Sequence, residues 1–174
     1  MANPADDAFQ SVLLSLFQLH GQVLHAADAM SADLGLTGAR WQVLNVVVRV
    51  PMTVSQIARR LSLRRQSVQR SVDELRRRDI VALEPNPDDR RAPLVRLSPR
   101  GEALMVQLRR RQDAWVADGL EGVAPGWLET LAVGLGQLTE RVRQATAMAI
   151  ERLPNLDSSA ARPTAPGRRL VLEE

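Results

Sequence analysis

Two short helical patterns, separated by only a few residues and followed by a turn-rich hairpin, constrain the fold of this chain most. The segment T-V-S-Q at residues 53–56 has the spacing of a capping box and predicts a helix that ends near Leu61. After a break at residues 62–63, a second helix is predicted over residues 64–78. Its apolar side recurs at helical spacing, through Val68, Val72 and Leu75. Two short helices joined by such a turn predict a helix-turn-helix.

A β-hairpin is predicted directly after these two helices. Residues 81–83 and 94–97 have the composition of short strands. The segment between them, E-P-N-P-D-D-R-R-A-P, is rich in turn-forming residues and places two arginines near its tip. The pattern therefore predicts a hairpin with a basic tip.

Longer helices are predicted on both sides of this block. The first covers residues 8–30, and a second starts after Thr37 and stops before Pro51. Ser98 and Pro99 predict a cap and first position for a helix that reaches about Leu120. The apolar seam of the first helix alternates steps of four and three: Phe9, Leu13, Leu16, His20, Val23, Ala27 and Met30.

A last helix begins near Pro125 and has three heptads of apolar spacing. Its seam consists of Leu128, Leu131, Leu135, Leu138, Val142, Ala145 and Ala149. This seam either packs only within one chain or pairs two chains. Because the first helix has a matching seam, we favour a homodimer.

The predicted fold is mainly α (α+β), a winged helix-turn-helix domain with a helical dimerisation domain. Residues 1–35 would supply the N-terminal dimerisation helix and residues 36–98 the winged helix-turn-helix. Residues 99–153 would supply the C-terminal dimerisation helices, and residues 154–174 a flexible tail. Aromatic residues make up only 3% of the chain, so Leu, Val and Ala must fill the core.

Charge is segregated along the chain. Residues 49–100 contain 13 arginines and 6 acidic residues, a net charge of +7 within a chain whose total is +3. Such a basic block favours contact with nucleic acid. No apolar run approaches the roughly 20 residues of a membrane-spanning helix, no signal peptide is visible, and cysteine is absent. These features favour a cytoplasmic protein.

The order of elements and two motifs resemble the MarR family of bacterial transcriptional regulators over about residues 8–152. The motifs are R-R-Q-S-V-Q-R-S-V-D-E-L-R-R-R-D-I-V and N-P-D-D-R-R-A-P-L-V-R-L-S-P-R-G. The resemblance implies a homodimer whose recognition helices enter major grooves and whose wings reach minor grooves. It also implies that Arg91 is the wing-tip arginine and that Asp89 braces the wing. Arg64 and Asp79 depart from the family pattern, which has a Ser or Thr cap and a closing Gly there. Either Ser62 caps the helix instead, or the helix starts less firmly.

The first half of the predicted recognition helix carries side chains suited to DNA. Arginine pairs with guanine and glutamine with adenine in the major groove, and no acidic residue occurs from Arg59 to Ser71. The alternative is an ordinary solvated face. We favour DNA contact for Arg64, Arg65, Gln66, Ser67, Gln69 and Arg70. The arginines at residues 76–78 would meet phosphate or pair with the C-terminus of this same helix.

Two further sites near the predicted DNA interface leave alternatives open. Arg90 and Arg91 could enter a minor groove or pair with neighbouring acids in an ordinary charged turn. Ser55 and Gln56 could bind phosphate through a helix N-terminus, although simple capping explains them nearly as well.

A ligand pocket is a second candidate site. His20 is the polar residue on the apolar seam of the first helix, which requires a partner or a ligand. The candidate lining is His20, Trp41, Met105, Arg109 and Trp115. Each of these is also a plausible core or interface residue. In proteins of this resemblance, small aromatic or phenolic ligands act at such a pocket.

No catalytic constellation, metal site or cofactor motif is evident. His20 and His25 diverge by about 140° on a helix, which prevents a shared metal ion. The sequence is therefore interpreted as a non-enzymatic homodimeric regulator, a repressor, that binds a pseudo-palindromic operator in double-stranded DNA. The alternative is a winged-helix protein-interaction module without sequence-specific DNA binding.

Overall fold

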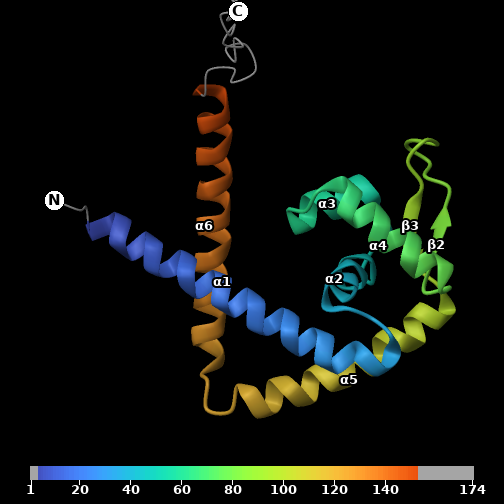
Figure 1. Ribbon diagram of the computed structural model, residues 1–174, viewed down its shortest axis with the longest axis horizontal. Coiled ribbons are helices and arrows are strands. Elements are labelled where there is room, and N and C mark those ends of the chain that lie inside the picture. The colour runs from blue at the N-terminus through green and yellow to red at the C-terminus, as the bar shows by residue number, and fades with distance from the viewer. Residues whose placement is uncertain (1–3, 153–174) are drawn as a thin grey trace, which may run out of the picture. The chain divides into compact units, whose positions relative to one another are not determined.

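The computed structural model describes residues 4–152, and these are mainly helical with one small antiparallel sheet (Figure 1). The chain divides into two compact units, residues 1–121 and residues 122–174. The first unit contains α1 (Pro4–Ser31), a 3₁₀ turn η1 (Ala32–Leu34), α2 (Gly38–Val47), β1 (Met52–Thr53), α3 (Val54–Leu61), α4 (Arg65–Arg77), β2 (Val81–Glu84), β3 (Leu94–Leu97) and α5 (Pro99–Gly119). The second contains α6 (Pro125–Arg152). The predicted tail at 154–174 lies outside the described residues.

The helix-turn-helix forms as its sequence predicts. The Thr53 hydroxyl accepts a hydrogen bond from the Gln56 N–H at 3.2 Å, and the Gln56 side chain accepts one from the Thr53 N–H at 2.7 Å. This capping box fixes the start of α3. The predicted apolar side of α4 is fully buried in a core shared with α2, α3 and the sheet. Its most buried members include Leu44, Ile57, Val68, Val72, Leu75, Ile80 and Val95.

The sheet has one more strand than the predicted hairpin. β3 pairs with β2 as expected, with Val81 opposite Leu97, and its other edge pairs with β1, where Met52 lies opposite Val95. The strand order is therefore β1-β3-β2. A strand of two residues leaves no alternation in the sequence, and its partner lies far along the chain. The hairpin prediction was therefore incomplete, and β1 ties the start of α3 to the base of the wing.

Helix α2 ends before Pro51, as predicted. Its last residue is Val47. At its start, Gly38 donates its N–H to the Asp28 carboxylate at 2.6 Å. A Cβ at Gly38 would lie 3.0 Å from the Leu24 carbonyl oxygen, so α1 and α2 approach closely here.

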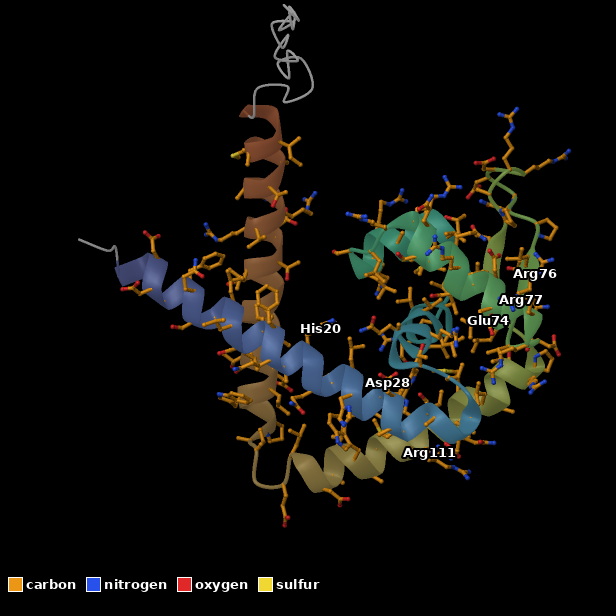
Figure 2. The ribbon with its side chains drawn as sticks, in the orientation of Figure 1. His20, Asp28, Glu74, Arg76, Arg77 and Arg111 are labelled. Atoms are coloured by element: carbon orange, nitrogen blue, oxygen red, sulfur yellow. The ribbon has the colours of Figure 1, made fainter. Side chains whose placement is uncertain are left out.

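Two arginines hold the connection between α1 and α2. Arg78 donates to the carbonyl oxygens of Leu34, at 2.8 Å, and Gly35. Arg111 of α5 (Figure 2) donates to the Met30 carbonyl at 2.6 Å and to both carboxylate oxygens of Asp33. The connection is therefore bonded at once to the end of α4 and to α5. Arg78 was predicted to meet phosphate or a helix C-terminus, and the structure assigns it to the η1 turn instead.

The S-P-R-G motif forms the joint between the sheet and α5. The Ser98 hydroxyl accepts from the Gly101 N–H at 3.0 Å and donates to the Asp79 carbonyl at 2.5 Å. Ser98 is thus the predicted cap, and Pro99 occupies the predicted first position. A Cβ at Gly101 would lie 2.0 Å from the Ile80 carbonyl oxygen, so this position excludes any side chain.

Several large apolar side chains of the long helices remain exposed in a single chain. On α1 they include Phe9, Val12, Leu14, Phe17 and Leu19. On α6 they include Trp127, Leu131, Val133, Val142, Met148 and Ile150. None of the helices within residues 4–152 combines the length and apolarity needed to span a membrane.

Candidate nucleic-acid interface

The face of α4 opposite its buried side is open to solvent and basic. Every predicted contact residue on this helix is exposed: Arg64, Arg65, Gln66, Ser67, Gln69 and Arg70. Their backbone is fixed because Val68, Val72 and Leu75 are anchored in the core. One side chain is already engaged, since the Gln69 amide donates to the Asp73 carboxylate at 2.9 Å. The helix therefore presents a rigid row of donors outward.

The N-terminal end of α4 lacks a side-chain cap. Arg64 occupies the cap position in extended conformation and makes no capping hydrogen bond. Ser62 does not replace it, because its backbone adopts a left-handed conformation with φ 53° and closes α3. The suggestion that Ser62 caps α4 was therefore wrong. The N–H groups of the first turn have no side-chain acceptor and can meet an anion such as a phosphate.

The C-terminal end of α4 is closed by Asp79 in a left-handed conformation with φ 55°. The Ile80 N–H bonds back to the Leu75 carbonyl at 2.9 Å, as in a glycine-closed helix. Near this end Arg77 pairs with Glu74, and Arg76 is exposed (Figure 2). Among the described residues, Arg77 and Arg78 are therefore engaged in contacts, whereas the guanidinium of Arg76 is exposed and has no partner.

The β2–β3 hairpin projects from the helices as a wing (Figure 1). Arg90 and Arg91 are exposed at its tip. The Asp89 carboxylate accepts from the Arg91 N–H at 2.9 Å, and the Asp89 carbonyl accepts from the Ala92 N–H at 3.0 Å. Asp89 therefore shapes the turn that carries Arg91 through backbone contacts.

A second wing residue was missed by sequence reasoning. Asn86 is 8% exposed, its amide donates to the Ala92 carbonyl at 2.9 Å, and its carbonyl accepts from the Asp88 N–H at 3.1 Å. It thus links the two arms of the hairpin below the arginines. An asparagine between two prolines was the signal that could have identified it, because Asn side chains bond readily to turn backbone. Ser55, on the first turn of α3, is half-buried.

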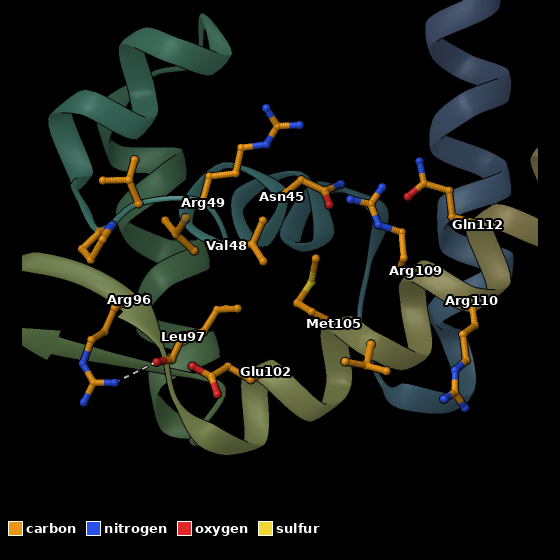
Figure 3. A pocket seen from close by; sticks show the side chains of 14 residues that line it. Asn45, Val48, Arg49, Arg96, Leu97, Glu102, Met105, Arg109, Arg110 and Gln112 are labelled. Carbon is orange, nitrogen blue, oxygen red and sulfur yellow. Dashed lines mark hydrogen bonds between the residues drawn. The ribbon is translucent and has the colours of Figure 1, made fainter.

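The predicted ligand-pocket residues fall into two neighbouring cavities and one outlier. Met105 and Arg109 line a cleft of about 840 Å³ between the end of α2, β3 and α5 (Figure 3). Trp41 and Trp115 line a smaller pocket of about 90 Å³ between α1, α2 and α5. His20 is exposed and lines neither cavity. The structure therefore brings four of the five residues to adjoining cavities and leaves His20 apart.

Comparison with protein families gives one match in the DNA-binding part. The model of the MarR family matches residues 34–92, which contain the helix-turn-helix and most of the wing. The uncharacterized protein Rv2011c of Mycobacterium tuberculosis is 35% identical over 105 residues, which are 60% of this chain and 73% of that protein. The uncharacterized protein Mb2034c of Mycobacterium bovis matches with the same values.

Solved structures share the fold at low sequence identity. The transcriptional regulator BldR from Sulfolobus solfataricus has a TM-score of 0.70 at 18% identity, covering 80% of this chain and 99% of that one. CouR from Rhodococcus jostii RHA1, bound to p-coumaroyl-CoA, has a TM-score of 0.66 at 24% identity, covering 73% and 90%. MarR from E. coli has a TM-score of 0.58 at 21% identity, covering 71% and 92%.

Proposed function

Because this chain belongs to the MarR family of transcriptional regulators, we propose that it binds double-stranded DNA as a homodimer and represses transcription. The observation that carries the proposal is the exposed basic face of α4 beside a wing with two exposed arginines. In this arrangement α4 enters a major groove and reads base edges with its arginine and glutamine side chains. The proposed base or phosphate contacts on the helix pair are Ser55, Arg64, Arg65, Gln66, Ser67, Gln69 and Arg70.

The wing contacts the neighbouring minor groove. Arg91 inserts at the tip and Arg90 lies beside it, where a narrow groove concentrates negative potential. Asp89 braces the tip by holding the Arg91 backbone. The exposed apolar faces of the long helices support dimerisation. A two-fold dimer requires a pseudo-palindromic operator with half-sites about one helical turn apart. Such a regulator acts in the bacterial cytoplasm, on the nucleoid.

A small aromatic ligand is proposed to release the operator. Two tryptophans line the smaller pocket, and CouR, which shares the fold, is bound to p-coumaroyl-CoA. A ligand regulates only through different affinities for the DNA-competent and incompetent states. The pocket walls include α2, which packs against α4, so pocket occupancy can bias the position of α4.

The direct test is fluorescence anisotropy on labelled DNA from the region upstream of the gene, across a salt series. We expect binding that exceeds that of scrambled DNA and weakens steeply with salt, because bound arginines release counterions. Arg91→Ala should weaken binding by about tenfold or more, in the range of one lost groove contact. Arg110→Ala, which removes the same charge from an exposed position on α5, serves as the control.

Equal affinity for scrambled DNA, unchanged by Arg91→Ala, would instead favour a winged-helix protein-interaction module. The acid-free first half of α4 argues against that alternative, since a protein-binding face tolerates acidic residues there. Catalysis is not proposed, because the similar proteins of known class are described as transcriptional regulators.

A further inference from the structure

The smaller pocket contains no charged side chain. All ten of its lining residues are neutral, with apolar walls that include Val23, Leu24 and Met30, and with amides from Gln42, Asn45 and Gln112. A carboxylate placed there would lose its hydration without gaining a cation. A free aromatic acid, whose charge sits directly on its ring, is therefore a poor occupant.

Trp41, which lines this pocket, carries a buried hydrogen-bond donor that is unused. The residue is 4% exposed, and its indole N–H has no acceptor among the residues that the structure describes. A buried donor without a partner is uncommon in proteins and is destabilising until an acceptor arrives. A neutral acceptor, such as the carbonyl oxygen of an acyl group, satisfies it without adding charge.

The size of the pocket limits what enters it. Its volume of about 90 Å³ is smaller than the roughly 150 Å³ cavity that holds benzene in an engineered protein core. Trp115 lines it with a side chain that is 42% exposed and can therefore move aside. The pocket thus suits a short acyl group directly, and a single ring after a shift of Trp115.

The adjoining cleft has the opposite character. Its lining includes four arginines and one glutamate, above a floor that contains the buried Val47, Leu97 and Met105. Arg96 pairs with Glu84, whereas Arg109 has no ion pair among the described residues. Figure 3 shows the Arg109 guanidinium directed toward Asn45. At about 840 Å³ the cleft lies within the size range of sites for drug-sized ligands and suits a polyanion.

Asn45 and Gln112 line both cavities, so the neutral pocket and the arginine cleft adjoin each other. From this separation of a neutral end and a cationic end, we infer that the ligand is a conjugate. A compact uncharged acyl or aryl group occupies the tryptophan pocket, its carbonyl accepts from the Trp41 N–H, and a phosphate-bearing carrier lies along the cleft against Arg109. The inference rests on the proposed ligand-controlled function and names the chemical class of the ligand.

The test is calorimetric titration of the full-length protein with three probes: benzoyl-CoA, free benzoate and CoA alone. Benzoyl-CoA should bind at least about tenfold more tightly than either part, because both cavities are filled at once. Arg109→Gln should weaken benzoyl-CoA binding by about tenfold through loss of a charged phosphate contact. Trp41→Phe should weaken benzoyl-CoA several-fold and leave the affinity for CoA unchanged. Arg100→Gln, elsewhere on α5 and exposed, is the matched control.

Three results would overturn the inference: no binding of benzoyl-CoA, benzoate binding as tightly as benzoyl-CoA, or an affinity unaffected by Arg109→Gln. Circular dichroism of each variant excludes loss of folding. Operator binding, measured in parallel by anisotropy, separates this inference from the proposed function. Intact operator binding without benzoyl-CoA binding defeats the ligand inference alone. Benzoyl-CoA binding without operator binding supports the site and defeats the proposed function.

Discussion

Gly101 lies where the backbone of Ile80 leaves no room for a side chain. A Cβ there would sit 2.0 Å from the Ile80 carbonyl oxygen, which is backbone and can yield only by moving the sheet-to-helix joint. We expect Gly101→Ala to lower the free energy of unfolding by about 2 kcal/mol or more, as in overpacked cores. Chemical denaturation measures this change. At Gly119 a Cβ would meet no described atom within 4 Å beyond its chain neighbours and its own helix backbone, so Gly119→Ala should leave stability near that of the wild type.

Some residue-level roles followed from the sequence and others did not. The capping residues Thr53 and Ser98 were predictable because capping depends on neighbours within a few positions. Asp79 was likewise placed correctly at a left-handed position. The contacts of Arg78 with the η1 turn join residues more than forty positions apart. No local pattern encodes such a contact, so the sequence predicted only phosphate or the C-terminus of its own helix as partners of Arg78.

At the scale of elements, the wing depends on Asn86. Its amide donates to the Ala92 carbonyl and so joins the two arms of the hairpin beneath Arg90 and Arg91, while its carbonyl accepts from the Asp88 N–H on its own arm. Asn86→Ala leaves the partly buried Ala92 carbonyl without its donor and should cost about 1 kcal/mol of local stability. We therefore expect increased hydrogen exchange across the wing and weaker operator binding, although Asn86 need not touch DNA. Asp88→Ala serves as the control, because it keeps the backbone N–H that donates to Asn86. Unchanged hydrogen exchange across the wing in Asn86→Ala would contradict the role of Asn86 in holding the hairpin.

The connection between α1 and α2 leads to a second prediction at the scale of elements, which concerns the pH dependence of stability. The Arg111 guanidinium bonds to Asp33 and lowers the pKa of that carboxyl below its ordinary value of 3.8. Because the folded-state pKa is lowered, the ion pair stabilises the fold above the unfolded pKa, and this contribution is lost as pH falls through the folded value. Unfolding midpoints of the wild type should therefore fall more steeply below pH 3.8 than those of Asp33→Asn. In an Arg111→Gln background, Asp33→Asn should make no further difference; a retained difference would refute the pairing.

Element prediction succeeded where periodicity is long and failed where it is short. The helices and the β2–β3 hairpin are carried by repeated apolar spacing or by a dense run of turn residues. β1 has two residues and η1 has three, so both are too short for a repeated spacing of apolar residues to appear in the sequence. Both are created by long-range contacts, of β1 with β3 and of η1 with Arg78.

At the scale of the whole molecule, the sequence identified pocket residues without locating them. Trp41, Met105, Arg109 and Trp115 come from two helices, and only packing reveals that they divide between a neutral pocket and a cationic cleft. His20 was grouped with them because it is the polar residue on the apolar seam of α1. In a single chain, His20 is exposed and lines neither cavity.

The exposed apolar faces make the final prediction, which concerns assembly. Leu131 and Val142 are 38% and 42% exposed on α6, at seam positions that repeat in the heptad pattern. Large apolar groups in such a row favour a partner helix. The double substitution Leu131→Glu with Val142→Glu should halve the mass measured by sedimentation. Each monomer would then bind only one operator half-site, so the affinity for the operator should fall by about a hundredfold or more through lost bivalency.

Gln137→Glu adds a negative charge at an exposed α6 position outside the seam and should remain dimeric. Circular dichroism and tryptophan fluorescence must show that the double variant keeps its helices and core. Under that condition a monomer with weak DNA binding supports dimerisation through the α6 seam. A dimer that persists with both glutamates places the interface on another surface, because two charges per chain could not be buried there without ion partners.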